Sequence, residues 1–153
     1  MALLRTKNLF FVCIGNELRG DDYIGIYLGK KLMRSRLKER IFLAYSTPEN
    51  CVEEVLKKNP DVVIFLDAVQ AGQEAGTIIL KEIKPDEPVG LSVSTHSIPI
   101  ETVASIIRSV STKRLGFYVL GIQVGQIEFG KRLSKEVTEA ANSLLKAIVG
   151  FYY

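Results

Sequence analysis

The sequence predicts an α/β fold, a single three-layer αβα domain over residues 1–153 with a mostly parallel, twisted sheet of about five strands and helices on both faces. Two observations predict it. Apolar runs such as "LFFVCIG" and "VVIFLDAV" have no polar face, which is typical of strands that are buried on both sides. Such runs alternate along the chain with segments of helical periodicity, which indicates βαβ units and a covered sheet.

The strand segments differ in how completely they are buried. The first and third are continuous apolar runs, whereas "TIILKEI" mixes polar and apolar residues and has the character of an edge strand. "LSVST", at 91–95, is a short extended segment. In chain order, the expected strands are residues 9–15, 41–47, 62–69, 77–83 and 116–124.

The first helix is expected from Asp22 to about Arg36, because apolar residues recur there every four positions. Gly25 and Gly29 are also four residues apart, so one face of this helix is bare and can lie close to the sheet.

Three further helices are marked by their first residues. Pro48 opens a short helix, and Ser97 with Pro99 marks the start of another. Ser134 is expected to cap the last helix.

Composition and charge narrow the class of protein. The net charge of +3 is too small to argue for a nucleic-acid partner, and the densest basic cluster, "RSRLKER", is interpreted as the solvated end of a helix. Cys13 and Cys51 do not make a disulfide framework, so a reducing, cytoplasmic location is expected. No stretch has the length of a membrane span. A monomer is expected, because no helix shows a sustained second apolar stripe.

The loop "GNELRGDD" follows the first strand and has the outline of a phosphate-binding loop. Gly15 and Gly20 have the spacing of that motif, but Asp21 and Asp22 stand where it continues with Lys and Ser or Thr. Each carboxylate would repel a phosphate at about 4 Å by roughly 1 to 4 kcal/mol, so nucleotide binding is disfavoured. Both Asp residues suit a helix start, and since one suffices to cap it, the other can point elsewhere.

Two more polar residues follow predicted strands. Asp67 ends the apolar part of "VVIFLDAV", where a carboxylate is costly unless it is compensated, for instance by loop amides. His96, in "STHSIP", is the only histidine of the chain. A single histidine excludes the two-histidine zinc motif on a helix. A serine triad with Ser94 or Ser97 is disfavoured, because no Gly-x-Ser-x-Gly turn occurs.

Asp22, Asp67 and His96 are expected at the carboxyl ends of strands, which meet at one rim of a parallel sheet. Two carboxylates and a neutral imidazole suit a divalent ion of intermediate hardness, such as nickel, zinc or manganese. Three protein ligands leave coordination positions open for water or substrate, as a reactive site needs. The residue types therefore predict an open metal site without choosing the metal.

At these residues the chain resembles the endopeptidases that mature nickel–iron hydrogenases. "GNELRGDD" is similar to the opening signature of that family, "FLDAV" to its second and "STHSIPI" to its third. The three occur in the family's order, and the alternation of strands and helices is similar to its fold, so the resemblance covers nearly the whole chain.

The resemblance implies that Asp22, Asp67 and His96 are the metal ligands and that Asp21 is a neighbour rather than a ligand. It implies that the substrate is the precursor of a hydrogenase large subunit, from which a C-terminal peptide is removed after nickel has been inserted. Nickel would then be carried by the substrate as a recognition element, and zinc or cadmium could replace it in a crystal.

The chain departs from the usual family pattern at three positions. Arg19 stands where an apolar residue is common, Tyr23 where Gly is common and Val124 where Pro is common. These positions concern the walls of the cleft rather than the ligands, so they bear on which precursor is the partner.

Three other functions remain open at this point. The first alternative is a non-enzymatic metal-binding or metallochaperone module that uses the same three ligands. The others are a small-molecule or nucleotide-binding α/β domain and a peptidase of related fold whose substrate carries no nickel.

Overall fold

The computed structural model describes residues 8–91, 93 and 98–151, and in this part of the chain five strands form one sheet. The strand order is β2-β1-β3-β5-β4, and all neighbours are parallel except β4, which runs antiparallel to β5 at the edge. The predicted fold class is therefore confirmed. The strands are β1 (Leu9–Ile14), β2 (Ile41–Tyr45), β3 (Val62–Val69), β4 (Ile78–Glu82) and β5 (Gly116–Gln123).

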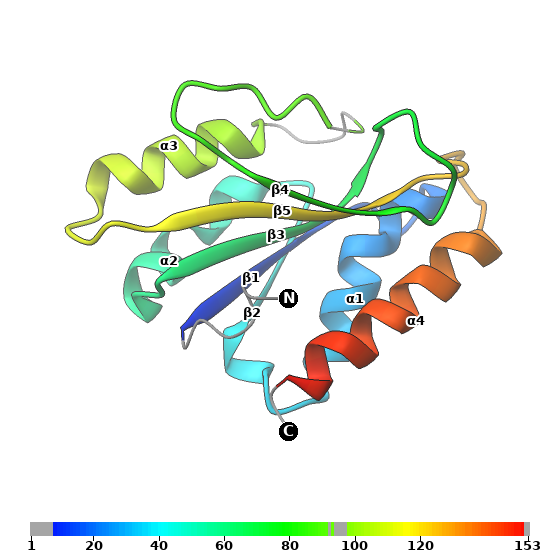
Figure 1. The fold of residues 1–153 in the computed structure, drawn as a ribbon, viewed down its shortest axis with the longest axis horizontal. Helices are drawn as coiled ribbons and strands as arrows, with labels where there is room; N and C mark the ends of the chain where they lie inside the picture. Colours follow the sequence, from blue (N-terminus) through cyan, green and yellow to red (C-terminus); the bar gives the residue numbers. More distant parts are fainter. Residues whose placement is uncertain (1–7, 92, 94–97, 152–153) are drawn as a thin grey trace.

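Helices cover both faces of this sheet (Figure 1). Helices α1 (Ile24–Leu32) and α4 (Lys135–Gly150) pack on one face, and α2 (Val52–Lys58) and α3 (Ile100–Val110) pack on the other. Short 3-10 turns precede α1, β2 and α2: η2 (Gly20–Tyr23), η3 (Lys38–Arg40) and η4 (Pro48–Cys51). In the described part of the chain, no helix is both long enough and apolar enough to cross a bilayer.

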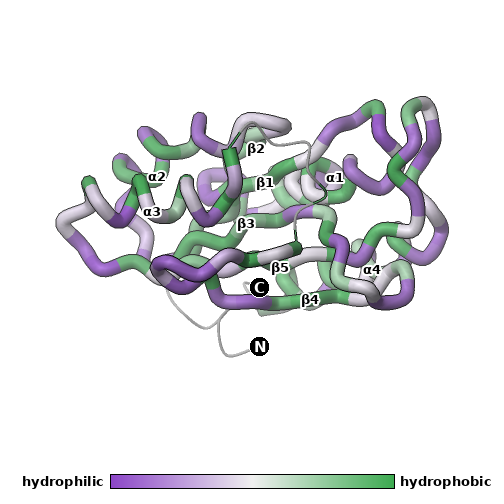
Figure 2. The backbone as a smooth tube through the Cα atoms, turned by 90° about the horizontal axis from the view of Figure 1, so that it is seen from above, coloured by the Kyte–Doolittle hydropathy of each residue, from purple (hydrophilic) through white to green (hydrophobic). Residues whose placement is uncertain are grey.

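The sheet separates two hydrophobic cores because successive side chains of a strand point to opposite faces. Along β1, Phe11 and Cys13 pack toward α1 and α4, whereas Phe10 and Val12 pack toward α2 and α3. Viewed from above, hydrophobic residues concentrate along the central strands (Figure 2). The continuous apolar runs in the sequence thus reflect burial on both faces.

The N-terminal half of α1 lies directly against the carboxyl ends of β1 and β3. A Cβ atom at Gly25 would lie 2.1 Å from the carbonyl oxygen of Ile14 and 2.3 Å from that of Leu66. One at Gly29 would lie 2.6 Å from the sulfur of Cys13. The expected bare helix face is therefore real, and only glycine allows this contact between helix and sheet backbone.

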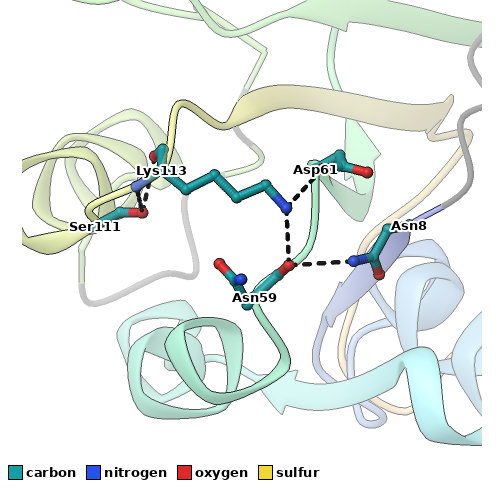
Figure 3. A network of polar contacts seen from close by, with 5 residues as sticks. All are labelled: Asn8, Asn59, Asp61, Ser111 and Lys113. Atoms are coloured by element: carbon teal, nitrogen blue, oxygen red, sulfur yellow. Dashed lines mark hydrogen bonds and ion pairs between the residues drawn. The ribbon is translucent and has the colours of Figure 1, made fainter.

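The opposite rim of the sheet is closed by a polar network (Figure 3). The carbonyl of Asn59 accepts hydrogen bonds from Asn8 Nδ2 at 3.1 Å and from Lys113 Nζ at 3.2 Å. Lys113 also forms an ion pair with Asp61 at 2.6 Å. These contacts join the turns that precede β3 and β5, so the polar groups of this rim serve the structure.

Several predicted boundaries need correction. Helix α1 ends at Leu32 rather than near Arg36, so "RSRLKER" follows the helix and continues into η3 instead of forming a helix end. Residues 46 and 47 lie outside β2. Most of the expected extended segment at 91–95, together with Ser97, lies outside the described residues.

Candidate functional site

The turn η2 brings two adjacent carboxylates into the interior at the carboxyl rim of the sheet. Asp21 and Asp22 are both fully buried. The guanidinium Nη1 of Arg19 lies 3.9 Å from Oδ2 of Asp22, which makes an ion pair within the loop. Arg19 also stacks over the ring of Phe129, with 5.6 Å between the guanidinium carbon and the ring centroid. The position that departs from the family pattern therefore faces one of the predicted ligands.

Asp21 is a structural carboxylate. Its Oδ2 accepts hydrogen bonds from the backbone N–H groups of Gly125 at 2.7 Å and Gln126 at 2.9 Å and from the Ser134 hydroxyl at 2.8 Å. Its Oδ1 accepts one from the Ser134 N–H at 2.7 Å. Asp21 thus fastens η2 to the segment between β5 and α4.

This arrangement corrects the prediction for Ser134. The residue stands at the N-cap position of α4, as expected, but its hydroxyl donates to Asp21 and makes no cap hydrogen bond to the helix. The hydroxyl is directed at the buried carboxylate of Asp21, to which it donates a charge-assisted hydrogen bond, and not at the N–H groups of the first turn of α4.

Asp67 lies within β3, close to its carboxyl end, and its side chain is only 2% exposed. Its Oδ1 accepts a hydrogen bond from the backbone N–H of Ala68 at 2.8 Å, so part of the amide compensation considered for this residue is present. Asp67 also lines a pocket of about 320 Å³. The pocket lies between the 88–91 segment and the first turn of α3, where Pro99 and Ile100 form part of its wall.

Asp22 and Asp67 belong to the same rim. The turn η2 contacts β3. Three residues after Asp22, the backbone of Gly25 lies against the carbonyl oxygen of Leu66, the residue that precedes Asp67. His96, the third predicted ligand, lies outside the described residues, and α3 begins four residues after it.

These donors fit a divalent cation in their chemistry, because two buried carboxylates supply hard oxygen ligands and negative charge. The described residues contain no group of three or more His, Cys, Asp or Glu side chains able to hold a metal, and that set does not include His96. The three-ligand site therefore stays a prediction.

The two cysteines contribute no thiolate. Both are buried and free of disulfide bonds. Burial raises the pKa of the Cys51 thiol to about 12 and raises that of Cys13 as well. Neither is a nucleophile at neutral pH, since the thiolate is the reactive form.

Sequence reasoning missed Gln123, whose buried side chain organises the loop after β3. Its Oε1 accepts hydrogen bonds from the N–H groups of Ala71 at 2.7 Å and Gln73 at 3.4 Å. Its Nε2 donates to Gln70 Oε1 at 2.8 Å. The only signal in the sequence is an uncharged polar residue at the end of an apolar strand.

Comparison with known proteins decides the family. The sequence profile described as "Hydrogenase maturation protease" matches residues 26–151 of this chain. The chain belongs to this family. The match includes Asp67 and His96 and begins four residues after Asp22. Membership makes the chain a peptidase and confirms the resemblance drawn from its three signatures.

Individual relatives agree with this assignment. A Methanocaldococcus jannaschii protein, provisionally named a hydrogenase maturation protease, is 30% identical over 96% of this chain and 89% of its own length. The Hydrogenase 3 maturation protease of Escherichia coli is 23% identical over 92% of this chain and 88% of its own length. The crystal structure of the [NiFe] hydrogenase maturation protease HycI from Thermococcus kodakarensis superposes with a TM-score of 0.83 and 27% identity, covering 99% of this chain and 98% of that one.

Proposed function

We propose that this hydrogenase maturation protease removes a C-terminal peptide from the precursor of a nickel–iron hydrogenase large subunit and recognises the nickel that the precursor carries. The observation that carries the proposal is the placement of two buried carboxylates, Asp22 and Asp67, at the carboxyl rim of the sheet of a peptidase. Ligands bind at this rim in parallel α/β sheets.

Asp22, Asp67 and His96 would complete the coordination of the substrate's nickel. Their oxygen and nitrogen donors suit that ion, and their two negative charges offset its charge. When bound, nickel supplies Lewis acidity near the peptide bond that is cut. The carboxylates hold the substrate in register, and one of them serves as general base for the attacking water. A thiolate nucleophile is not needed, which agrees with the two buried, protonated cysteines.

A cytoplasmic location is part of the same proposal. Both cysteines are buried as free thiols in the folded chain. Such a chain needs no oxidising compartment.

The decisive experiment compares two forms of one cognate precursor. Purified protein is incubated with nickel-loaded and nickel-free large-subunit precursor, and the C-terminal truncation is measured by mass spectrometry. Cleavage of the loaded form alone is expected. Equal cleavage of both forms would refute nickel recognition, and cleavage of neither would contradict the proposed reaction. Tight nickel binding without cleavage would instead support the metallochaperone alternative.

Variants separate the proposed site from general damage. Asp22→Asn, Asp67→Asn and His96→Ala should each lower cleavage of the loaded precursor by at least about a hundredfold, because each removes a ligand. Asp61→Asn is the matched control, since Asp61 pairs with Lys113 at the opposite rim. If Asp61→Asn and one of the three ligand variants both cleave the loaded precursor at the wild-type rate, the residue changed in that variant is not a ligand.

A further inference from the structure

A second hollow opens on the α1 and α4 side of the molecule, with a volume of about 600 Å³. It lies between α1 and the 131–138 segment that leads into α4. We call it the basic cleft, because five of the side chains that line it are basic and one is acidic. These six are Glu17, Lys30, Lys31, Arg34, Lys131 and Arg132.

The basic cleft gathers more positive charge than the whole chain carries. Its lining has a surplus of four positive charges, whereas the net charge of the chain is +3, so the remaining residues are slightly acidic in sum. Glu17 pairs with Lys30 at 3.1 Å, and this hydrogen bond raises the pKa of Lys30. Within the described residues, Lys31, Lys131 and Arg132 make no ion pair. Their charge is available to a ligand.

Two tyrosines of α1 and η2 hold the lysines in place. The rings of Tyr23 and Tyr27 meet edge to face, with 6.3 Å between centroids and 74° between planes. Lys30 lies over Tyr23 at 5.7 Å and Lys31 over Tyr27 at 5.5 Å, both within cation–π range. The hydroxyl of Tyr27 also donates to Asn142 of α4 at 3.1 Å. Side chains ordered in this way lose less entropy when a ligand binds.

The basic cleft is joined to the carboxyl rim. Gly20 and Tyr23 line it, and both belong to η2, the turn that carries Asp22. The opposite wall carries Lys131 and Arg132, and it is fixed to the same turn by the hydrogen bonds of Asp21 with Gln126 and Ser134. Asp22 itself does not line the cleft, so a polypeptide bound there would lie against the turn that carries Asp22 rather than against its carboxylate.

We propose that the basic cleft binds an acidic stretch of the substrate polypeptide, an inference that rests on the proposed function. Its volume is within the range of about 300 to 1,000 Å³ that ligand pockets occupy. Ammonium groups and guanidinium forks are the usual partners of Asp and Glu carboxylates. The acidic stretch would position the precursor beside Asp22 and add affinity at a distance from the bond that is cut.

Two other anions fit the observations less well. Nucleic acids need basic groups along an extended path that follows the phosphates, whereas these are confined to one cleft. Free phosphate is typically bound by backbone N–H groups at a helix start. In η2 those groups are engaged, because the N–H of Asp21 donates to Gln126 and that of Asp22 donates to Arg19.

The test uses charge-reversal variants of the full chain. Lys131→Glu with Arg132→Glu changes two neighbouring residues of the basic cleft, and Lys57→Glu with Lys58→Glu changes two neighbouring exposed residues of α2 on the other face. Both pairs change the formal net charge from +3 to −1. The α2 pair also removes the exposed ion pairs of Lys57 with Glu54 and of Lys58 with Glu39, so its stability is compared with that of the wild type. Circular dichroism and urea unfolding verify that both variants fold.

Binding is measured by fluorescence anisotropy with a labelled oligoglutamate peptide and with an oligothymidylate of equal charge. The cleft variant should bind oligoglutamate at least about tenfold more weakly than the wild type, and the α2 variant should change by less than about twofold. An equal loss in both variants would overturn the inference, because net charge alone would then explain binding. Tighter binding of oligothymidylate than of oligoglutamate would also overturn it, in favour of a nucleic-acid site.

Cleavage of the nickel-loaded precursor separates this inference from the proposed function. The cleft variant should show a raised KM and an unchanged kcat, because the acidic stretch is bound equally in the ground and transition states. If the wild type cleaves the precursor and the cleft variant has the same KM as the α2 variant, the inference is overturned and the proposed function stands. Oligoglutamate binding with no cleavage by the wild type would refute the proposed function alone.

Discussion

Asp21 and Asp22 are adjacent and equally buried, yet they make different contacts. Replacing each with Asn can separate a role in stability from a role in cleavage. Asp21→Asn is expected to destabilise the fold strongly. Asp22→Asn is expected to abolish cleavage. Both substitutions preserve the shape of the side chain and remove its charge.

The magnitude for Asp21 follows from its four hydrogen bonds, at 2.7 to 2.9 Å. An amide has one accepting oxygen, which can at best keep the three bonds made by Oδ2. Its NH2 group then faces the N–H of Ser134, a donor against a donor. Losing one charge-assisted hydrogen bond lowers the free energy of unfolding by about 1.5 to 3 kcal/mol, and the other three hydrogen bonds weaken. The free energy of unfolding is therefore expected to fall by about 2 to 4 kcal/mol in total. For a chain of this size that lowers Tm by about 4 to 16 °C.

The ion pair of Asp22 with Arg19 is a weaker contact than these hydrogen bonds. The Arg19 guanidinium lies 3.9 Å away, at the outer edge of an ion pair, whereas the four hydrogen bonds of Asp21 are 2.7 to 2.9 Å long. Loss of this ion pair should therefore lower the free energy of unfolding by less than loss of the Asp21 hydrogen bonds does.

Urea unfolding followed by circular dichroism measures both stabilities, and the precursor assay measures cleavage. Ser134→Ala is a useful companion, because it removes one donor to Asp21 and should cost less than Asp21→Asn. Equal stability of Asp21→Asn and the wild type would refute the structural role of Asp21. Full cleavage activity in Asp22→Asn would refute the separation of the two residues.

The remaining predictions concern packing and pH. Gly25→Ala should lower the free energy of unfolding by several kcal/mol and lower cleavage, because its Cβ would meet the backbone oxygens of Ile14 and Leu66. Gly150→Ala has open space around the new Cβ, so its stability should be unchanged or raised. Equal unfolding midpoints of the two variants would contradict this. Burial raises the pKa of Cys51 from 9.0 to about 12. Above pH 9 the thiol ionises in the unfolded chain but stays protonated in the folded one, so the free energy of unfolding falls as pH rises, by about 1.4 kcal/mol per pH unit. Below pH 9 this contribution to stability is complete. Urea unfolding across this range should show a shallower loss for Cys51→Ala than for the wild type, and identical slopes would count against burial of the thiol.

The local sequence pattern predicts the structure correctly where a segment's own residues determine whether it is buried. The run "VVIFLDAV" is β3 from its first residue to its last, because every side chain in it is buried and no turn residue interrupts it. The bare face of α1 was visible in the spacing of Gly25 and Gly29. The edge character of β4 was visible in its mixed composition, and Ile78 and Leu80 are indeed partly exposed there.

Contacts between distant segments could not be predicted in this way. Asp21 has the sequence signature of a helix-start residue, but the groups that bind it lie more than 100 residues further along the chain. The same is true of the basic cleft, where Lys31 of α1 and Lys131 each resemble an ordinary solvated lysine. Arg34, which the sequence pattern places at a solvated helix end, instead lines that cleft. The packing of α4 against α1 creates these sites, and no local pattern encodes it.

The most direct test of the account is an experimental structure of the protein crystallised with nickel, with anomalous diffraction recorded at the nickel absorption edge. We predict one strong peak within about 2.0 to 2.2 Å of carboxylate oxygens of Asp22 and Asp67 and of an imidazole nitrogen of His96. Coordinates that place the imidazole too far from the two carboxylates to share one ion would contradict it.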